Sequence, residues 1–233
     1  MNGQYAIAID GPSGAGKSSL ARRCAAAFGF LYVDTGAIYR TVGLAALRRG
    51  IDRRDEAAVK ALLPELQIEM CYNETGEQRM VLNGEDVSAE IRLPEVSICA
   101  SDVSALPAVR AFLLEMQRKM AREHDVIMDG RDIGTVVLPN AELKIFLSAS
   151  AEARAERRLK ELRQKGVEAS FEEVLRDIEY RDEQDTNRAA APLRAAEDAV
   201  PVDTTEIDFE ASFRLLCEVI EAHLGLKPRG QQA

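Results

Sequence analysis

The sequence is poor in the residues from which metal sites and disulfide frameworks are built. His124 and His223 are its only histidines, so histidine-rich metal sites and relay chemistry have little material, and we expect both side chains to be structural or exposed. The four cysteines lie far apart and form no C-x-x-C pair, which predicts neither a compact metal site nor a secreted disulfide framework. We expect reduced, mostly buried thiols at Cys24, Cys71, Cys99 and Cys217.

An excess of positive charge and long apolar runs are also missing. The formal net charge is −9, which argues against broad electrostatic binding to nucleic acid or to anionic membranes. The apolar run at residues 5–9 is too short for a signal peptide and is followed by Asp10, and no segment approaches the length of a membrane span. With 233 residues, 46% hydrophobic and 30% charged, we expect one compact cytoplasmic enzyme.

A glycine-rich stretch near the start, AIAIDGPSGAGKS at residues 6–18, carries the clearest chemical signal. Gly11, Gly16, Lys17 and Ser18 satisfy G-x-x-x-x-G-K-[ST], in which backbone N–H groups surround a polyphosphate, the lysine reaches its β- and γ-phosphates, and the serine hydroxyl binds Mg²⁺. A predicted strand at 6–10 and a predicted helix at 19–28 place this loop at a helix N-terminus, which favours phosphate. That context disfavours the alternative, an ordinary glycine-rich turn with a surface lysine.

Short apolar runs alternate with helical patterns along the chain. Besides residues 6–10, we expect strands at 30–34, at 127–128 within DVIMDG, at 143–149 and at 199–205. This alternation predicts an α/β, doubly wound fold with five parallel strands and covering helices. The last helix, about 209–224, has apolar residues at helical spacing, which predicts core packing, and it should end at Gly225.

Two segments interrupt this rhythm. Residues 66–88 alternate apolar with polar positions and contain the turn sequences NETGE and NGED, which predicts a small antiparallel unit. Residues 151–190 form a charged helical arm, in which Ser170 and Glu173 suggest a capping box. The arm could be a solvated helical face, or a mobile lid that closes over phosphates with its arginines.

Three further clusters bear charge. DTGAIYR at 34–40 follows the second strand, where Arg40 could grip a phosphate, although a surface arginine with Asp34 as a helix cap is the better interpretation of that segment alone. DGRD at 129–132 follows another strand, where Asp129 could help to hold Mg²⁺ directly or through water and Arg131 could neutralise phosphoryl charge. A simple β-turn with an ion pair is the alternative there. RDEQDTNR at 181–188 alone would read as a solvated helix end.

Taken together, the clusters supply what phosphoryl transfer needs, which is a nucleotide cradle, metal-binding oxygens and several cations. Six ordered blocks from about residue 5 to 225 resemble the bacterial-type cytidylate kinases, a family of P-loop nucleoside monophosphate kinases. The blocks are IDGPSGAGKSS at 9–19, DTGAIYR at 34–40, GEDVS and EIR within 84–92, DGRDIGTVVLP at 129–139, KIFLSAS at 144–150, and RDEQDTNRAAAPL at 181–193.

The resemblance implies transfer of the γ-phosphoryl group of ATP to CMP or dCMP with Mg²⁺, giving ADP and CDP or dCDP in pyrimidine nucleotide metabolism. It also implies one cytidylate kinase domain with a P-loop NTPase core at about 1–60, 103–150 and 190–226. An inserted monophosphate-binding region would lie at about 61–102, and a lid at about 151–189. We expect a monomer whose partners are small molecules, not nucleic acid or membrane.

Site residues follow from the resemblance position by position. Those expected to be catalytic are Lys17, Asp129, Arg131 and Arg188, with Ser18 and Asp129 at the metal. Those expected at ATP are Gly11, Pro12, Ser13, Gly14, Ala15, Gly16, Lys17, Ser18, Ser19, Arg157 and Arg158. Those expected at CMP are Thr35, Arg40, Ser101, Arg110, Arg131, Asp132, Arg181, Asp185 and Arg188.

Within the CMP set, the resemblance places Arg40, Arg131 and Arg188 at the phosphate and Arg181 and Asp185 near the ribose. It places Ser101, Arg110 and Asp132 at the base. Asp132 could accept a hydrogen bond from the exocyclic amine of cytosine and Arg110 could donate to ring acceptors, whereas uracil would turn a carbonyl toward Asp132.

Two other functions remain to be compared with this one. Another small-molecule P-loop kinase, acting on shikimate, gluconate or a different nucleoside monophosphate, shares the phosphate loop. A regulatory GTPase should carry an N-K-x-D motif, which this sequence does not contain.

Overall fold

The structure is a computed structural model that describes residues 4–164 and 166–229. The chain divides into two compact units. One comprises Met1–Tyr32 with His124–Ala233, and the other is Val33–Glu123. The sequence prediction instead divides the chain by expected function, into a core, an inserted region and a lid. The boundaries of those three parts differ from those of the two compact units, and that division stays a prediction.

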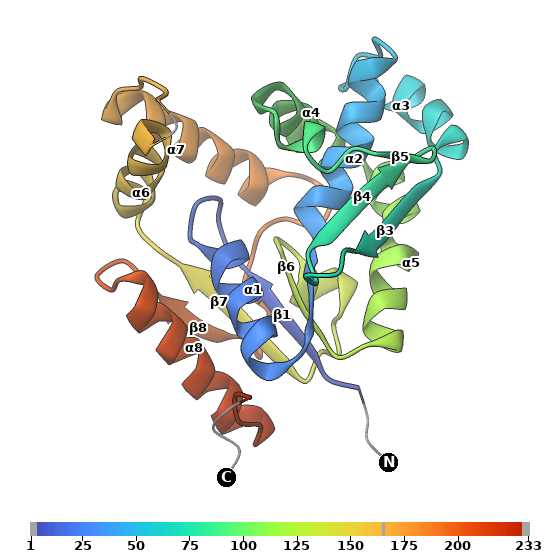
Figure 1. The fold of residues 1–233 in the computed structure, drawn as a ribbon. Coiled ribbons are helices and arrows are strands. Elements are labelled where there is room, and N and C mark those ends of the chain that lie inside the picture. The colour runs from blue at the N-terminus through green and yellow to red at the C-terminus, as the bar shows by residue number, and fades with distance from the viewer. Residues whose placement is uncertain (1–3, 165, 230–233) are drawn as a thin grey trace. The chain divides into compact units, whose positions relative to one another are not determined.

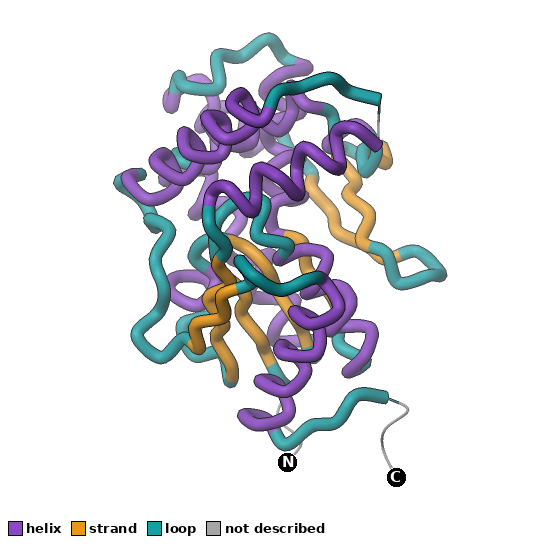
Figure 2. The backbone as a smooth tube through the Cα atoms, turned by 90° about the vertical axis from the view of Figure 1, so that its left-hand side faces the viewer, coloured by secondary structure: helices purple, strands orange, loops and turns teal. Residues whose placement is uncertain are grey.

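The first unit contains a five-stranded sheet in the order β2-β6-β1-β7-β8, except that the last two residues of β2, Val33 and Asp34, belong to the second unit. The strands are β1 (Ala6–Asp10), β2 (Leu31–Asp34), β6 (Val126–Gly130), β7 (Leu143–Ser148) and β8 (Val200–Asp203). β1 lies at the centre and pairs in parallel with β6 and β7, and β7 pairs in parallel with β8. Every residue of β1 and β6 is buried, as expected for strands covered on both faces. These pairings confirm the predicted parallel α/β sheet, whose strands are drawn in orange in Figure 2.

Two helices from opposite ends of the chain share one core in this unit (Figure 1). α1 (Lys17–Phe28) and α8 (Phe209–Leu224) both contribute to an apolar cluster that includes Ile7, Ile145 and Leu216. α8 ends at Gly225, as predicted. The core packing predicted for the apolar residues of this helix is wrong for the first of them, because Phe209 is 43% exposed and lies beneath the guanidinium of Arg23.

The charged arm forms two helices with a small core of their own. α6 (Ala151–Gln164) and α7 (Phe171–Asn187) pack through Ala155, Leu159, Val174 and Ile178. The predicted capping box at the start of α7 is confirmed, because Ser170 accepts from the Glu173 backbone N–H and the Glu173 side chain accepts from that of Ser170. The arm is therefore a helical hairpin with an apolar seam.

The second unit consists of helices around a small antiparallel sheet. The helices are α2 (Thr35–Arg48), α3 (Glu56–Leu62), α4 (Pro94–Ser104) and α5 (Pro107–Glu123), and the strands are β3 (Ile68–Tyr72), β4 (Gln78–Leu82) and β5 (Glu85–Asp86). The predicted antiparallel unit at 66–88 is confirmed. Asn83 and Gly84 both have positive φ, the conformation that a two-residue hairpin turn requires.

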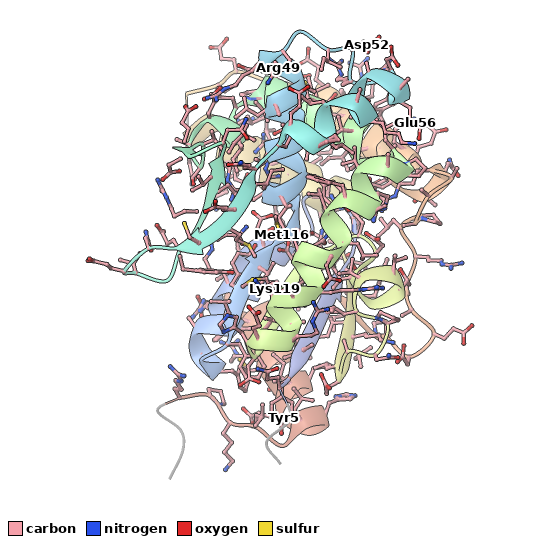
Figure 3. All side chains as sticks on the ribbon, turned by 90° about the vertical axis from the view of Figure 1, so that its right-hand side faces the viewer. Tyr5, Arg49, Asp52, Glu56, Met116 and Lys119 are labelled. Carbon is pink, nitrogen blue, oxygen red and sulfur yellow. The ribbon has the colours of Figure 1, made fainter. Side chains whose placement is uncertain are left out.

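Helix α5 shows how this unit separates its core from solvent. Met116 packs against the apolar cluster around Leu113 and Val109, whereas Lys119, one turn further along, is exposed (Figure 3). No single helix among the described residues is long and apolar enough to cross a membrane; α4 and α5 pass that test only as a pair, which is bent by 99°.

The expectations for cysteine and histidine can also be compared with the structure. Cys24, Cys99 and Cys217 are buried free thiols and Cys71 is an exposed one, which confirms that most are buried. Both histidines are exposed.

Candidate active site

The glycine-rich segment forms a loop (residues 11–16, here the phosphate loop) between β1 and α1, as the motif predicts. Gly11 has φ 151°, and a Cβ at that position would lie 1.9 Å from the carbonyl oxygen of Leu147, so only glycine fits there. Gly16 immediately precedes α1 with φ 85°. The loop therefore opens directly onto a helix N-terminus, whose N–H groups and dipole favour an anion.

Lys17 lies at the first position of α1 and is only 5% exposed. Its Nζ donates a hydrogen bond to the carbonyl oxygen of Pro12 at 2.6 Å. Burial and, to a smaller extent, the nearby positive charge of Arg131 together lower the pKa of Lys17 from its usual 10.5 to about 7. An anion beside Lys17 would favour its protonated form, and the phosphate loop places the N–H donors for such an anion next to it.

The side-chain oxygens of Ser18 and Asp129 lie in contact beside the phosphate loop. The Ser18 hydroxyl donates to Oδ2 of Asp129 at 2.7 Å, and the hydroxyl of Tyr32 donates to Oδ1 at 2.9 Å. A hydroxyl and a buried carboxylate in contact are oxygen donors that fit Mg²⁺. Among the described residues, no group of three or more His, Cys, Asp or Glu side chains could hold a metal ion. Phosphates and water are ligands that Mg²⁺ commonly keeps beside one or two carboxylates.

Asp10, the last residue of β1, is a site residue that sequence reasoning missed. It is 5% exposed and accepts hydrogen bonds from the backbone N–H groups of Ile133 and Gly134, at 2.8 and 2.7 Å. Burial raises the pKa of Asp10 from its usual 3.8 to about 6, although these two hydrogen bonds oppose the shift. Asp10 thus fixes the backbone that follows β6, where Arg131 and Asp132 stand.

Four charged residues, here the charged cluster, meet beyond the end of β6. Nε of Arg131 donates to Asp185 at 2.6 Å, and Arg188 lies 3.5 Å from Asp132 and 3.9 Å from Asp185. The side chains of Arg188 and Asp132 are 7% and 6% exposed. Sequence reasoning selected all four residues, and the structure brings them together from β6 and the C-terminal end of α7.

The phosphate loop and the charged cluster begin at paired positions in the sheet. Asp10 at the end of β1 is the register partner of Gly130 at the end of β6. Loops that leave the carboxyl ends of neighbouring parallel strands form the usual ligand site of open α/β sheets. The sheet therefore brings the phosphate loop and the two arginines of the charged cluster to one edge.

The other arginines selected on the charged arm have different surroundings. The guanidinium of Arg157 donates to Oγ1 and to the carbonyl oxygen of Thr204 and to the carbonyl oxygen of Ile207. Arg158 is half exposed and pairs with Glu161, and Arg181 is exposed on α7. Contact of these three arginines with nucleotide stays a prediction.

Arg154, which sequence reasoning counts among the arginines of a possible lid but assigns to neither ATP nor CMP, is the deeply buried arginine of this arm. Its side chain is 5% exposed and donates to the carbonyl oxygen of Ser13 in the phosphate loop and to both carboxylate oxygens of Asp182. In the sequence it looks like one more charge on a solvated helix, so no local signal could have distinguished it.

The second unit holds the remaining predicted residues. Asp34 caps α2 through the backbone N–H of Ala37 at 2.9 Å, which confirms the capping interpretation. The same carboxylate lies 3.1 Å from Arg40 and 2.9 Å from Arg92. Burial alone would raise the pKa of Asp34, but the charges of the two arginines outweigh it and lower the pKa. Arg92 is a neighbour of Arg40 that sequence reasoning missed.

Three further predicted residues lie in this unit. Arg110 on α5 lies over the ring of Tyr39, 5.4 Å from its centroid, and donates to the carbonyl oxygen of Ser104 at 3.1 Å. Ser101 is exposed on α4, and Thr35 is buried as the first residue of α2. Each has a defined place in its unit, and their contact with a substrate stays a prediction.

The family model and the similar known proteins agree on one family. The family model described as cytidylate kinase matches residues 7–222. A cytidylate kinase of Carboxydothermus hydrogenoformans is 51% identical over 214 residues, which cover 92% of this chain and 96% of that protein. A cytidylate kinase of Pasteurella multocida is 45% identical and covers 97% of this chain and 100% of its own length.

Solved structures resemble the fold at much lower identity. An uncharacterized protein from Eubacterium ventriosum ATCC 27560 has a TM-score of 0.50 at 12% identity, and the match covers 94% of this chain and 99% of that one. A shikimate kinase from Bacteroides thetaiotaomicron has a TM-score of 0.44 at 14% identity, over 93% of this chain and 98% of its own.

Proposed function

Because this chain belongs to the cytidylate kinase family, we propose that it transfers the γ-phosphoryl group of ATP to CMP or dCMP through the residues at the edge of its five-stranded sheet. The observation that carries this assignment is the pairing of Asp10 with Gly130. Because of this pairing, the phosphate loop and the segment that carries the charged cluster leave the sheet at neighbouring positions. The phosphates of the donor and of the acceptor would then lie near adjacent positively charged side chains.

The donor side of the reaction is assigned to the phosphate loop. Its backbone N–H groups hold the polyphosphate of ATP, and Lys17 places an ammonium beside the group that moves. Ser18 and Asp129 would hold Mg²⁺, directly or through water, and the ion would neutralise charge on the phosphates of ATP. Arg157 and Arg158 belong to the same proposal as contacts to ATP.

The acceptor side is assigned to the charged cluster. Arg131 and Arg188 would bind the phosphate of CMP and offset the charge of the transferring group, because a planar guanidinium suits bidentate phosphate contact. Asp185 accepts from Nε of Arg131, so its carboxylate already fixes that guanidinium. No covalent nucleophile is needed, since positioning and electrostatics supply most of the catalysis in phosphoryl transfer.

Base and sugar recognition complete the proposal. Asp132 would accept from the exocyclic amine of cytosine, and Asp185 and Arg181 would contact the ribose. The CMP contacts expected in the second unit are Thr35, Arg40, Ser101 and Arg110. A carboxylate at Asp132 disfavours uracil, whose carbonyl would face it with like polarity.

A panel of acceptors tests the reaction. Purified protein with ATP and Mg²⁺ should phosphorylate CMP and dCMP much faster than UMP, AMP, shikimate or gluconate, measured as ADP formation. Turnover of UMP or AMP that greatly exceeds turnover of CMP would refute the assignment.

The proposal includes a monomeric, cytoplasmic enzyme that acts on small molecules and binds neither nucleic acid nor membrane. The net charge of −9 supports the last point, because broad electrostatic binding to nucleic acid or to an anionic membrane requires an excess of positive charge. Light scattering coupled to size-exclusion chromatography should give the mass of one chain, 25.6 kDa, and twice that mass would contradict it.

A further inference from the structure

Arg154 is a buried cation that the proposed reaction does not use. It lies in the first turn of α6, just after β7, and its side chain is 5% exposed. Nε donates to the carbonyl oxygens of Ala149 and Ser150, at 2.9 and 3.3 Å. Burial of an arginine is costly unless its N–H groups are satisfied, so this side chain is held in one orientation.

One side of the guanidinium holds the phosphate loop. Nη1 donates to the carbonyl oxygen of Ser13 at 3.0 Å. The carbonyl of one residue and the N–H of the next point in opposite directions across a trans peptide bond, and the described chain has no cis peptide bond. Fixing the Ser13 carbonyl toward Arg154 therefore also fixes the N–H of Gly14, which then points away from Arg154.

The aliphatic part of the same side chain lies beside Gly14. This glycine has φ 78°, and a Cβ built on it would lie 3.5 Å from Cβ of Arg154. The loop backbone is thus held by the hydrogen bond from Arg154 to Ser13, next to a glycine that the Arg154 side chain flanks. Movement of Arg154 would change the direction of one of the N–H groups that the motif uses for phosphate.

The other side of the guanidinium holds helix α7. Nη1 and Nη2 donate to the two carboxylate oxygens of Asp182 at 3.0 and 2.5 Å, in the bidentate geometry that fixes both partners. Asp185 lies three residues further along the same helix and accepts from Arg131. One rigid helix therefore connects Asp182, in contact with Arg154, to the charged cluster.

We propose that Arg154 and Asp182 are positioning residues that hold the phosphate loop and α7 in register, so that ATP and CMP bind cooperatively. This inference rests on the proposed function, because it takes ATP to occupy the phosphate loop and CMP the charged cluster. Binding of ATP fixes the Ser13–Gly14 peptide, Arg154 passes that constraint to Asp182, and α7 then presents Asp185 and Arg188 to the acceptor.

Packing alone does not account for the pair. α6 and α7 already share an apolar seam formed by Ala155, Leu159, Val174 and Ile178. A buried ion pair is weak evidence for stability, because desolvation offsets most of its attraction. Its specific contribution is orientation. A ligand that binds more tightly when the Arg154–Asp182 contact is formed than when it is broken favours the formed arrangement for the other ligand as well, which makes binding cooperative.

Equilibrium binding tests this inference without catalysis. A non-hydrolysable ATP analogue and CMP are titrated separately and together into the wild type, Arg154→Met and Asp182→Asn, with calorimetry as the readout. In the wild type each ligand should tighten the other by the same factor, because coupling is reciprocal. Arg154→Met should weaken the ATP analogue about tenfold and abolish the coupling, because the loop loses a hydrogen bond from a charged group.

Asp182→Asn distinguishes the contact of Arg154 with Asp182 from its contact with Ser13. It keeps the hydrogen bond from Arg154 to Ser13, so affinity for the ATP analogue alone should stay within about twofold while the coupling falls. Matched controls are Arg163→Met and Glu183→Gln, which make the same changes of charge at exposed positions on α6 and α7. Both should bind and couple like the wild type.

Three results would overturn the inference. They are a wild type without coupling, coupling that survives in both folded variants, and equal loss of coupling in the controls. If Arg154→Met fails to fold by circular dichroism, Asp182→Asn alone decides, since it leaves the buried arginine with all of its carbonyl acceptors. A wild type that neither binds nor phosphorylates CMP would instead refute the proposed function.

Discussion

The contribution of the Asp10 carboxylate to the free energy of unfolding should depend on pH, and a measurement at several pH values can therefore detect it. The carboxylate is 5% exposed and its pKa is raised from 3.8 to about 6 by burial. An acid whose pKa is raised on folding is penalised in its ionised form, so its contribution to stability falls as pH rises from about 4 to about 6. The full difference corresponds to about 3 kcal/mol, because a tenfold change in proton affinity is about 1.4 kcal/mol.

The perturbation is Asp10→Asn, which preserves the shape of the side chain and removes its titration. The asparagine oxygen can accept from only one of the Ile133 and Gly134 N–H groups, while its amide nitrogen faces the other. That mismatch costs about 1–3 kcal/mol at every pH. Its size does not depend on pH, so the pH dependence of the difference between variant and wild type belongs to the carboxylate.

Urea unfolding followed by far-ultraviolet circular dichroism measures the difference. The free energy of unfolding of Asp10→Asn, relative to the wild type, should increase by about 2 kcal/mol between about pH 4 and about pH 7. A difference that does not change between about pH 4 and about pH 7 would refute the reasoning.

Three other predictions concern catalysis. Lys17→Ala should lower kcat by about 10²- to 10³-fold, because it removes a preorganised cation at the transferring phosphoryl group, and circular dichroism should show an intact fold. Asp132→Ala should raise KM for CMP far more than KM for ATP in steady-state assays; equal increases in both constants would count against a role in reading the base. Tyr32→Phe should raise the Mg²⁺ concentration needed for half-maximal activity several-fold, because Asp129 loses one of its two hydroxyl donors, and an unchanged Mg²⁺ dependence would contradict this.

The parts of the fold that sequence reasoning located correctly have strong local signals. The strands β1 and β7 are buried apolar runs bounded by polar or turn residues, and the phosphate loop has a fixed spacing of glycines. The start of α7 was predictable because a capping box is a pattern within four residues. The four members of the charged cluster were selected from two motifs in the sequence, not from any knowledge of their contacts.

The parts that sequence reasoning missed depend on contacts between distant segments. Asp10 is a site residue only because β6 lies beside β1 in the sheet. The order of strands in a sheet cannot be predicted from the sequence of either strand alone. Arg92 meets Asp34 although 58 residues separate them. The π-type turn at Ile133–Val137 begins where Asp10 accepts two backbone N–H groups, so its cause also lies outside its own segment.

Asp185 makes the best sense as a group that orients Arg131. Nε of Arg131 is held by Asp185 and its Nη1 by the carbonyl oxygen of Gly130, so the plane of the guanidinium is fixed from one side. A guanidinium has five N–H donors in a rigid fork, and those on the other edge keep a defined direction for a phosphate. Donors that are already aligned need not reorganise when charge develops, which is the condition for strong electrostatic catalysis. Removing Asp185 would therefore impair the alignment of Arg131 even though the deletion of a negative charge makes the site more attractive to phosphate.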